Sequence, residues 1–171
     1  MRLFVAIHFS QDVKRRLMMA QDMLRRQGKA NFTRPENLHL TLAFIGETND
    51  TEAAKRALDA VCRGAEAFKM TVGGAGNFGD LWWTGIEKNR ELESLAQSIR
   101  GALRAVGFRI DTKPFKPHIT LAREMRAYGE VRLDVPLTEM VVGRVSLMKS
   151  ERIGGRLVYT EIHGVELRKG E

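Results

Sequence analysis

The sequence contains one cysteine, Cys62, among its 171 residues. A single thiol excludes a disulfide within the chain and any zinc site built on several cysteines. Cys62 falls on the apolar face of a helix expected from about Asp50, with Ala54, Leu58 and Val61. Because free cysteines are mostly core residues, we expect a buried, inert thiol. The alternative, a catalytic Cys–His pair, has no local signature here.

Long hydrophobic runs are also missing. No apolar run approaches the ~20 residues that a membrane span requires. The start of the chain has only five consecutive apolar residues, Leu3–Ile7, before a histidine. That run is too short for the core of a signal peptide, and no small-residue cleavage site follows it. We therefore expect a cytoplasmic protein with no membrane partner.

Several motifs that carry chemistry are absent as well. The chain has four histidines and no His-Glu-x-x-His, which argues against a metal site. It has no Gly-x-Ser-x-Gly, so a serine nucleophile is unsupported. The cluster Gly73–Gly76 lacks a following Lys-Ser/Thr, and we expect a loop there, a turn or bulge, with no phosphate-gripping role. Chemistry without a metal or cofactor is the better hypothesis.

The composition is that of an ordinary globular protein, with 43% hydrophobic and 29% charged residues. Its length fits one domain spanning residues 1–171, built from two small lobes that share an interface. The formal charge of +7 favours an anionic partner, and a phosphate-bearing molecule such as RNA fits best.

One stretch of the chain occurs twice, 79 positions apart. Thr33-Arg-Pro…His39-Leu-Thr-Leu-Ala is repeated as Thr112-Lys-Pro…His118-Ile-Thr-Leu-Ala, with seven identities over sixteen aligned positions. Unrelated windows of that length share only about one residue, so this is an internal repeat. The repeat extends back through a strand, a helix and the glycines Gly28 and Gly107, which we expect to end the two helices.

Each copy predicts a strand with two polar residues on one face. Because side chains alternate along a strand, His39 and Thr41 share a face opposite Leu40 and Leu42. The same holds for His118 and Thr120. Two such strands related by a pseudo-twofold would bring two imidazoles and two hydroxyls into one cleft.

The pattern along the chain predicts mixed helices and strands. We expect strands at residues 3–9, 68–72 and 81–86, in addition to the two motif strands. Helices are expected after the N-cap Ser10, from about Asp50, and over Leu92–Val106. Two long strands, about Thr138–Lys149 and Leu157–Leu167, should form a hairpin through Gly154-Gly155. Strands and helices do not alternate strictly, so we predict a bilobal α+β fold. Its pseudo-twofold lobes would have largely antiparallel sheets, helices outside and a central cleft.

Two imidazoles facing one substrate suit acid–base chemistry at a phosphodiester. One accepts a proton from water, and the other protonates the departing oxygen. The hydroxyls of Thr41 and Thr120 can donate to phosphate oxygens. Arg123 falls on the opposite face of a regular strand, but it reaches the phosphate if the strand ends or bulges near Ala122. His8 and His163 lie outside the repeat, and we interpret them as structural.

The paired motifs resemble those of the 2H phosphoesterase superfamily, and within it the RNA 2′,3′-cyclic phosphodiesterases once described as 2′-5′ RNA ligases. The similarity also covers Arg2–Ile7, Trp83–Ile86 and Ser150…Gly155…Tyr159. It implies a metal-free opening of a terminal 2′,3′-cyclic phosphate to a 2′-phosphomonoester. It also implies that His39 is the proton donor, His118 the acceptor, and Thr41, Thr120 and Arg123 the phosphate contacts.

The expected partner is therefore RNA with a 2′,3′-cyclic phosphate end, such as a tRNA fragment, bound by a monomer. Two alternatives remain open at this point. The same site could join RNA ends through a 2′-5′ linkage by microscopic reversibility, or the chain could be a non-catalytic RNA-binding module. A small cyclic nucleotide is a further possible substrate.

Overall fold

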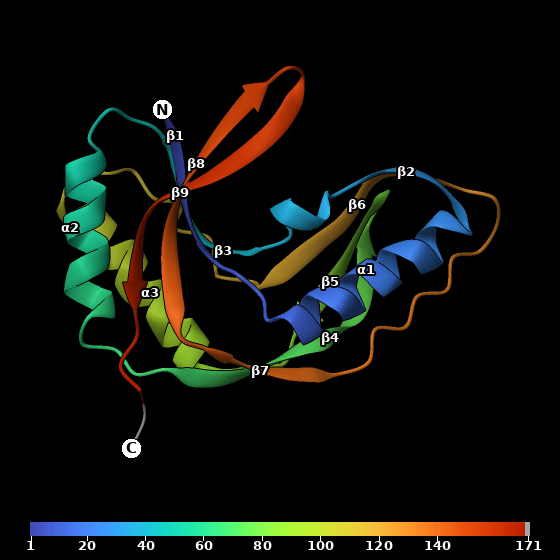
Figure 1. The fold of residues 1–171 in the computed structure, drawn as a ribbon, viewed down its shortest axis with the longest axis horizontal. Helices are drawn as coiled ribbons and strands as arrows, with labels where there is room; N and C mark the ends of the chain where they lie inside the picture. Colours follow the sequence, from blue (N-terminus) through green and yellow to red (C-terminus); the bar gives the residue numbers. More distant parts are fainter. Residues whose placement is uncertain (170–171) are drawn as a thin grey trace.

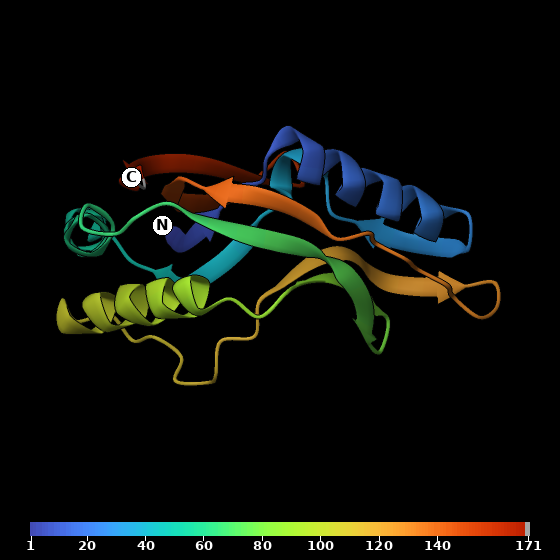
Figure 2. The same ribbon diagram turned by 90° about the horizontal axis from the view of Figure 1, so that it is seen from below.

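The computed structural model describes residues 1–169, which form two antiparallel sheets packed against helices (Figures 1 and 2). The strands are β1 (Arg2–Ile7), β2 (Gly28–Phe32), β3 (Leu40–Glu47), β4 (Phe68–Phe78), β5 (Leu81–Ile86), β6 (His118–Ala127), β7 (Thr138–Val142), β8 (Arg144–Ile153) and β9 (Arg156–Glu166). The helices are α1 (Gln11–Arg25), α2 (Thr51–Cys62) and α3 (Arg90–Ala105), with a 3-10 turn, η1, at Pro35–Asn37.

The two sheets contain the two motif strands separately. The four-stranded sheet has the order β3-β1-β8-β9, and the five-stranded sheet has the order β2-β6-β5-β4-β7. All neighbouring strands are antiparallel. α1 packs on β2, β6 and β7, whereas α3 packs on β3 and α2 packs on β8 and β9. The predicted bilobal α+β architecture is confirmed.

The repeat is visible in the structure, with an exchange of helices between its halves. β1 matches β5, α1 matches α3, and β3 matches most of β6, each at the offset of 79 positions. β1 and β3 lie in the four-stranded sheet, yet α1 between them covers the five-stranded sheet. β5 and β6 lie in the five-stranded sheet, while α3 covers the other one. Each helix therefore packs beneath the motif strand of the opposite half.

Helices α1 and α2 begin where the sequence predicts, because polar side chains satisfy their first amides. Ser10 Oγ accepts from the Val13 amide at 3.2 Å, and Asp50 Oδ1 accepts from the Ala53 amide at 3.1 Å. The apolar face of α3 is buried, with Leu92, Ala96, Ile99 and Leu103 no more than 1% exposed. Cys62 is buried as expected, and burial raises the pKa of its thiol to about 12.

The expectation that Gly28 ends a helix is wrong. α1 ends at Arg25, and Gly28 is the first residue of β2, a strand that the sequence analysis did not predict. A side chain at Gly28 would have its Cβ 2.4 Å from the carbonyl oxygen of Arg126 on the neighbouring strand β6. Glycine is required there by close packing of two strands. Its repeat partner Gly107 does terminate α3, with a φ of 102°.

Of the two forms expected at Gly73–Gly76, a turn or a bulge, the structure has the bulge, and it lies within β4 and not in a loop. The strand runs through the glycines, and its register against β5 shifts between Gly73 and Ala75. Gly74 has a φ of 75°, and a Cβ at Gly76 would lie 2.3 Å from the Trp83 ring. The glycines let β4 bend and pass closely over that indole.

The long strand expected over Thr138–Lys149 is two strands that belong to different sheets. β7 ends at Val142 in the five-stranded sheet, and β8 begins at Arg144 in the four-stranded sheet. The hairpin from β8 to β9 is confirmed, with Gly154 and Gly155 both at positive φ as a type I′ turn demands. No helix within residues 1–169 is long and apolar enough to cross a membrane.

Candidate active site

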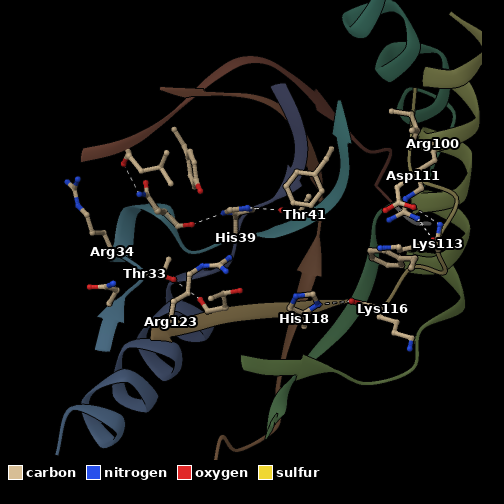
Figure 3. Close-up of a pocket in the computed structure, with 18 of the residues that line it drawn as sticks. Thr33, Arg34, His39, Thr41, Arg100, Asp111, Lys113, Lys116, His118 and Arg123 are labelled. Atoms are coloured by element: carbon tan, nitrogen blue, oxygen red, sulfur yellow. Dashed lines mark hydrogen bonds between the residues drawn. The ribbon is translucent and has the colours of Figure 1, made fainter. Parts of the chain in front are cut away.

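A cleft of about 550 Å³ is lined by residues from both sheets (Figure 3). The five residues selected from the sequence, His39, Thr41, His118, Thr120 and Arg123, all line it. Further lining residues come from the segments before the motif strands, from β3, from α3 and from β9: Thr33, Arg34, Asn37, Phe44, Arg100, Asp111, Lys113, Phe115, Lys116 and Tyr159. The structure therefore brings the two halves of the repeat to one cavity.

His39 stands between η1 and β3, with buried leucines on either side of it. Its Nδ1 lies 2.7 Å from the carbonyl oxygen of Asn37. Asn37 is itself 7% exposed, and its side-chain amide donates to the carbonyl of Leu157 on β9 at 2.9 Å. Because a carbonyl only accepts, Nδ1 carries the proton in this contact and Nε2 is left for other partners.

His118 is held in the matching way at the start of β6. Its Nδ1 donates to the carbonyl of Lys116 at 2.9 Å, and Lys116 is the repeat partner of Asn37. The ring of Phe78 meets the imidazole edge-on at 5.7 Å between centroids. Both motif histidines thus present Nε2, the nitrogen that is not tied to the main chain.

The surroundings of the two imidazoles differ. His39 is half-buried against Phe4 and Tyr159, with ring centroids 4.9 and 5.2 Å away, and its Nε2 lies 2.8 Å from Thr41 Oγ1. Burial lowers the pKa of His39, the Asn37 carbonyl works in the opposite direction, and the charge of His8 lowers it further. His118 is exposed, and among residues 1–169 its Nε2 has no hydrogen-bond partner.

Arg123 reaches the cleft because β6 bulges. Against β5, Trp83 pairs with Thr120 and Trp82 with Ala122, so Leu121 is an extra residue. Leu121 and Ala122 are consecutive buried residues, and the next side chain turns to the face of His118 and Thr120. This placement requires a strand end or a bulge near Ala122, as expected from the sequence, and the structure has the bulge.

β3 has the same bulge at the repeat-equivalent position. Against β1, Ala6 pairs with Thr41 and Val5 with Ala43, so Leu42 is extra. The residue that this turns into the cleft is Phe44, the repeat partner of Arg123, which is 72% exposed. Sequence reasoning missed Phe44, although the offset of 79 positions pairs it with Arg123 and could have identified it.

Tyr159 on β9 is another cleft residue that sequence reasoning did not assign to the site. Its ring packs edge-on against both Phe4 and His39. Burial raises the pKa of its phenol, while the charges of Arg123 and Arg152 act in the opposite direction. The alternation of residues in this segment predicts a strand without indicating which face meets the other lobe.

The remaining histidines do not line the cleft. His163 Nε2 lies 2.7 Å from Asp59 Oδ1, which links β9 to α2. His8 follows β1 and is close enough to His39 for its charge to affect that group. Over the part of the chain that the structure describes, no three His, Cys, Asp or Glu side chains cluster in a way that could hold a metal ion.

Comparison with known proteins gives consistent matches over most of the chain. The sequence profile of the 2′-5′ RNA ligase superfamily matches residues 11–154. An RNA 2′,3′-cyclic phosphodiesterase of Thermotoga maritima is 29% identical, over 99% of this chain and 97% of that protein. The crystal structure of TT0787 of Thermus thermophilus superposes with a TM-score of 0.86 at 30% identity, covering 100% of both chains. Escherichia coli LigT complexed with 3′-AMP matches with a TM-score of 0.80 at 26% identity, over 97% of this chain and 96% of that one.

Proposed function

Because the chain belongs to the 2′-5′ RNA ligase superfamily, the 2H phosphoesterases, we propose that its cleft hydrolyses RNA ends bearing a 2′,3′-cyclic phosphate to 2′-phosphomonoesters. The chain is an enzyme of the RNA 2′,3′-cyclic phosphodiesterase type. The observation that carries the proposal is the matched anchoring of two histidines at Nδ1, which leaves both Nε2 atoms untied to the main chain in one cleft.

In the proposed reaction, water attacks the phosphorus and gives its proton to Nε2 of His118. The bond between phosphorus and the 3′-oxygen breaks, and Nε2 of His39 donates a proton to that oxygen. The products are a 2′-phosphate and a free 3′-hydroxyl, so atoms and charge balance without a redox partner. Each step is general acid or general base catalysis, and an acid or base positioned in this way is typically worth about 10²–10⁴ in rate.

The tautomer of His118 is the one that a general base acting through Nε2 requires. Since its Nδ1 proton is engaged by the Lys116 carbonyl, the neutral ring has a lone pair on Nε2. His39 can act as the acid only as imidazolium. Burial disfavours that state in the free protein because it lowers the pKa, whereas the Asn37 carbonyl and a bound anionic phosphate both favour it.

Three further side chains are suited to the phosphate itself. The hydroxyls of Thr41 and Thr120 can donate to the non-bridging oxygens, on which charge accumulates in the transition state. The guanidinium of Arg123 can form two parallel hydrogen bonds with the same group. In the absence of substrate, Thr41 is engaged with His39 Nε2, and the substrate would take over that contact.

The test is product analysis with an RNA oligomer that ends in a 2′,3′-cyclic phosphate, in the presence of a chelator. We expect a single product with a 2′-phosphate and a turnover that EDTA leaves unchanged. A 3′-phosphate product would contradict the proposed direction of ring opening. Activity lost on chelation and restored by Zn²⁺ or Mn²⁺ would contradict a mechanism that needs only side chains.

A second activity, 2′-5′ ligation, is favoured because the superfamily that matches this chain is that of the 2′-5′ RNA ligases. The same acid and base would open the cyclic phosphate with the 5′-hydroxyl of a second RNA as the nucleophile in place of water. That hydroxyl would give its proton to Nε2 of His118 as its oxygen bonds to phosphorus, and the bond from phosphorus to the 3′-oxygen would break, with a proton from His39. Chromatography of a mixture of two RNA fragments distinguishes the two activities, because only ligation yields a longer strand. Water is present at far higher concentration than RNA ends, so we expect hydrolysis to dominate.

A further inference from the structure

One side chain from each repeat helix reaches the main chain of both motif segments. These side chains are Gln21 on α1 and Arg100 on α3, and they are separated by the repeat offset of 79 positions. Their different identities hide the correspondence in the sequence. Both helices pack beneath the motif strand of the opposite half, which is what allows the contacts.

Gln21 is 1% exposed, and its Nε2 has two carbonyl acceptors. It donates to the carbonyl of Thr33 at 2.6 Å and to the carbonyl of Leu121 at 3.0 Å. Thr33 begins the loop that leads to His39, and Leu121 is the bulged residue of β6. The amide of Thr33 also donates to the Leu121 carbonyl, at 3.1 Å.

Arg100 repeats this arrangement on the other side. Its Nε donates to the carbonyl of Leu42 at 3.0 Å, and its Nη1 donates to the carbonyl of Lys113 at 3.0 Å. Leu42 is the bulged residue of β3, and Lys113 lies in the loop that leads to His118. The guanidinium also lies over the ring of Phe115, 5.3 Å from its centroid.

Each side chain therefore connects the loop of its own half to the bulge of the other half. The bulges determine which face receives the residue two positions later, Arg123 in β6 and Phe44 in β3. The amide of Gln21 is buried, and an unpaired buried donor is costly, so this side chain depends on its two carbonyl partners. Arg100 is only partly buried, and its two hydrogen bonds go to the equivalent main-chain positions. The loss of either side chain should loosen the bulge that it holds.

We propose that Gln21 and Arg100 are positioning residues, which fix the two bulges and the two motif segments relative to each other. Gln21 holds the bulge at Leu121 that directs Arg123 to the phosphate. Arg100 holds the bulge at Leu42, next to Thr41, and the loop before His118. This inference rests on the proposed phosphodiesterase function, and it concerns side chains that do not themselves react.

The first experiment compares Gln21→Leu with Gln27→Leu. Gln27 follows the same helix and binds the carbonyls of Met23 and Arg132, away from the cleft, so it controls for the loss of a glutamine that bridges two segments. Since a displacement of about 1 Å at a catalytic group can cost up to about 10²-fold, we expect kcat/KM to fall at least tenfold in Gln21→Leu. It should stay within about twofold in Gln27→Leu at a similar change in Tm. Equal losses in both variants would overturn the inference.

A double-mutant cycle tests whether Gln21 acts through Arg123. Gln21→Leu should reduce kcat/KM greatly in the wild-type background and very little in the Arg123→Ala background, because the side chain that it positions is then gone. Independent losses that multiply would overturn this route of action.

Arg100 requires a different comparison because it also lines the cleft. Arg100→Gln removes the charge but keeps a donor of the kind that Gln21 uses at the equivalent position, whereas Arg100→Leu removes both. We expect the Gln variant to keep most of the activity that the Leu variant loses. If both variants are equally impaired, the charge is what matters, and Arg100 contacts substrate.

Failure of the proposed function remains distinguishable from failure of this inference. If the wild-type protein does not open the cyclic phosphate, the proposed function fails, and hydrogen exchange then decides the structural claim. We expect the Thr33 amide to exchange at least tenfold faster in Gln21→Leu than in the wild type, and unchanged in Gln27→Leu. Unaltered protection in Gln21→Leu would show that Gln21 does not hold the bulge.

Discussion

At the scale of single residues, the two motif histidines are chemically different in spite of their identical motifs. Both use Nδ1 to contact the carbonyl two positions earlier. Only His39 is enclosed by aromatic rings and bound to the threonine of its own motif. The repeated motif alone does not distinguish the two histidines, and the different surroundings make separate acid and base roles possible.

The assignment of His39 as the acid can be tested with a substrate whose 3′-bridging oxygen is replaced by sulfur. A thiolate leaves without protonation, so it removes the need for the acid. We expect His39→Ala to lose about 10²–10⁴ in kcat/KM on the oxygen substrate and to regain most of it on the sulfur substrate. His118→Ala should be impaired on both, and thermal melting should show that both variants are folded. Rescue of His118→Ala instead would reverse the two roles.

The lowered pKa of His39 also has a consequence for stability. The pKa of His39 is lower in the folded state than its ordinary value of 6.5, so its neutral form favours folding, and this contribution is complete above that pH. Its contribution is lost as the pH falls through the lower, folded-state pKa. We therefore expect Tm to fall from about pH 7.5 to about pH 5.5, and to fall less in His39→Gln. A pH dependence that is identical in both proteins would mean that burial of His39 has little influence on folding.

At the scale of elements, the sequence predicted what depends on local patterns. The N-cap at Ser10, the helix start near Asp50, the strand at Leu81–Ile86 and the Gly154-Gly155 turn are all found. Each of these signals lies within a few residues of the element it specifies, so no knowledge of the tertiary fold is needed. The five predicted cleft residues lie far apart in the sequence, and they could be predicted together because the repeat relates the two halves of the chain.

What the sequence could not predict depends on contacts between distant segments. β2 is a strand because β6 lies beside it. The predicted long strand is interrupted at Gly143 because the residues before it pair in the five-stranded sheet and those after it pair in the four-stranded sheet. The bulges at Leu42 and Leu121 are visible only in the register against neighbouring strands. Gln21 and Arg100 escaped notice because they match in position and not in identity.

The packing role of Gly28 gives a prediction at this scale. In Gly28→Ala the new methyl group would meet main-chain atoms of β6, which cannot turn aside as a side chain can. We expect a loss of about 1–3 kcal/mol in the free energy of unfolding, the usual cost of overpacking. Gly64→Ala is the matched control, because nothing lies within 4 Å of its added Cβ. Urea titration measures both variants, and equal stabilities would show that β2 shifts at no cost.

At the scale of the whole molecule, the excess positive charge is concentrated at the cleft. Five of its lining residues are cationic and one is acidic, in a chain with a formal charge of +7. The cations are Arg34, Arg100, Lys113, Lys116 and Arg123, and the acid is Asp111. These residues come from both halves of the repeat, so both lobes contribute to the positive electrostatic potential of the cleft. Such a surface attracts an anionic polymer more strongly than a small anion.

This distribution predicts that the affinity for RNA falls with salt. Each backbone phosphate engaged on a single strand contributes roughly −0.7 to the slope of log affinity against log salt. Replacing Lys113 and Lys116 together by Ala should reduce the magnitude of that slope by up to about 1.4 if each side chain meets one phosphate. Lys55→Ala, on α2 and outside the cleft lining, should leave the slope unchanged.

Binding measurements with an oligomer and with a mononucleoside 2′,3′-cyclic phosphate separate two outcomes. A steep slope for the oligomer alone identifies the lysines as contacts to the RNA strand beyond its terminal nucleotide. A flat slope for both ligands would mean that the site recognises the terminal nucleotide alone, with the lysines serving only as solvated charges at its rim.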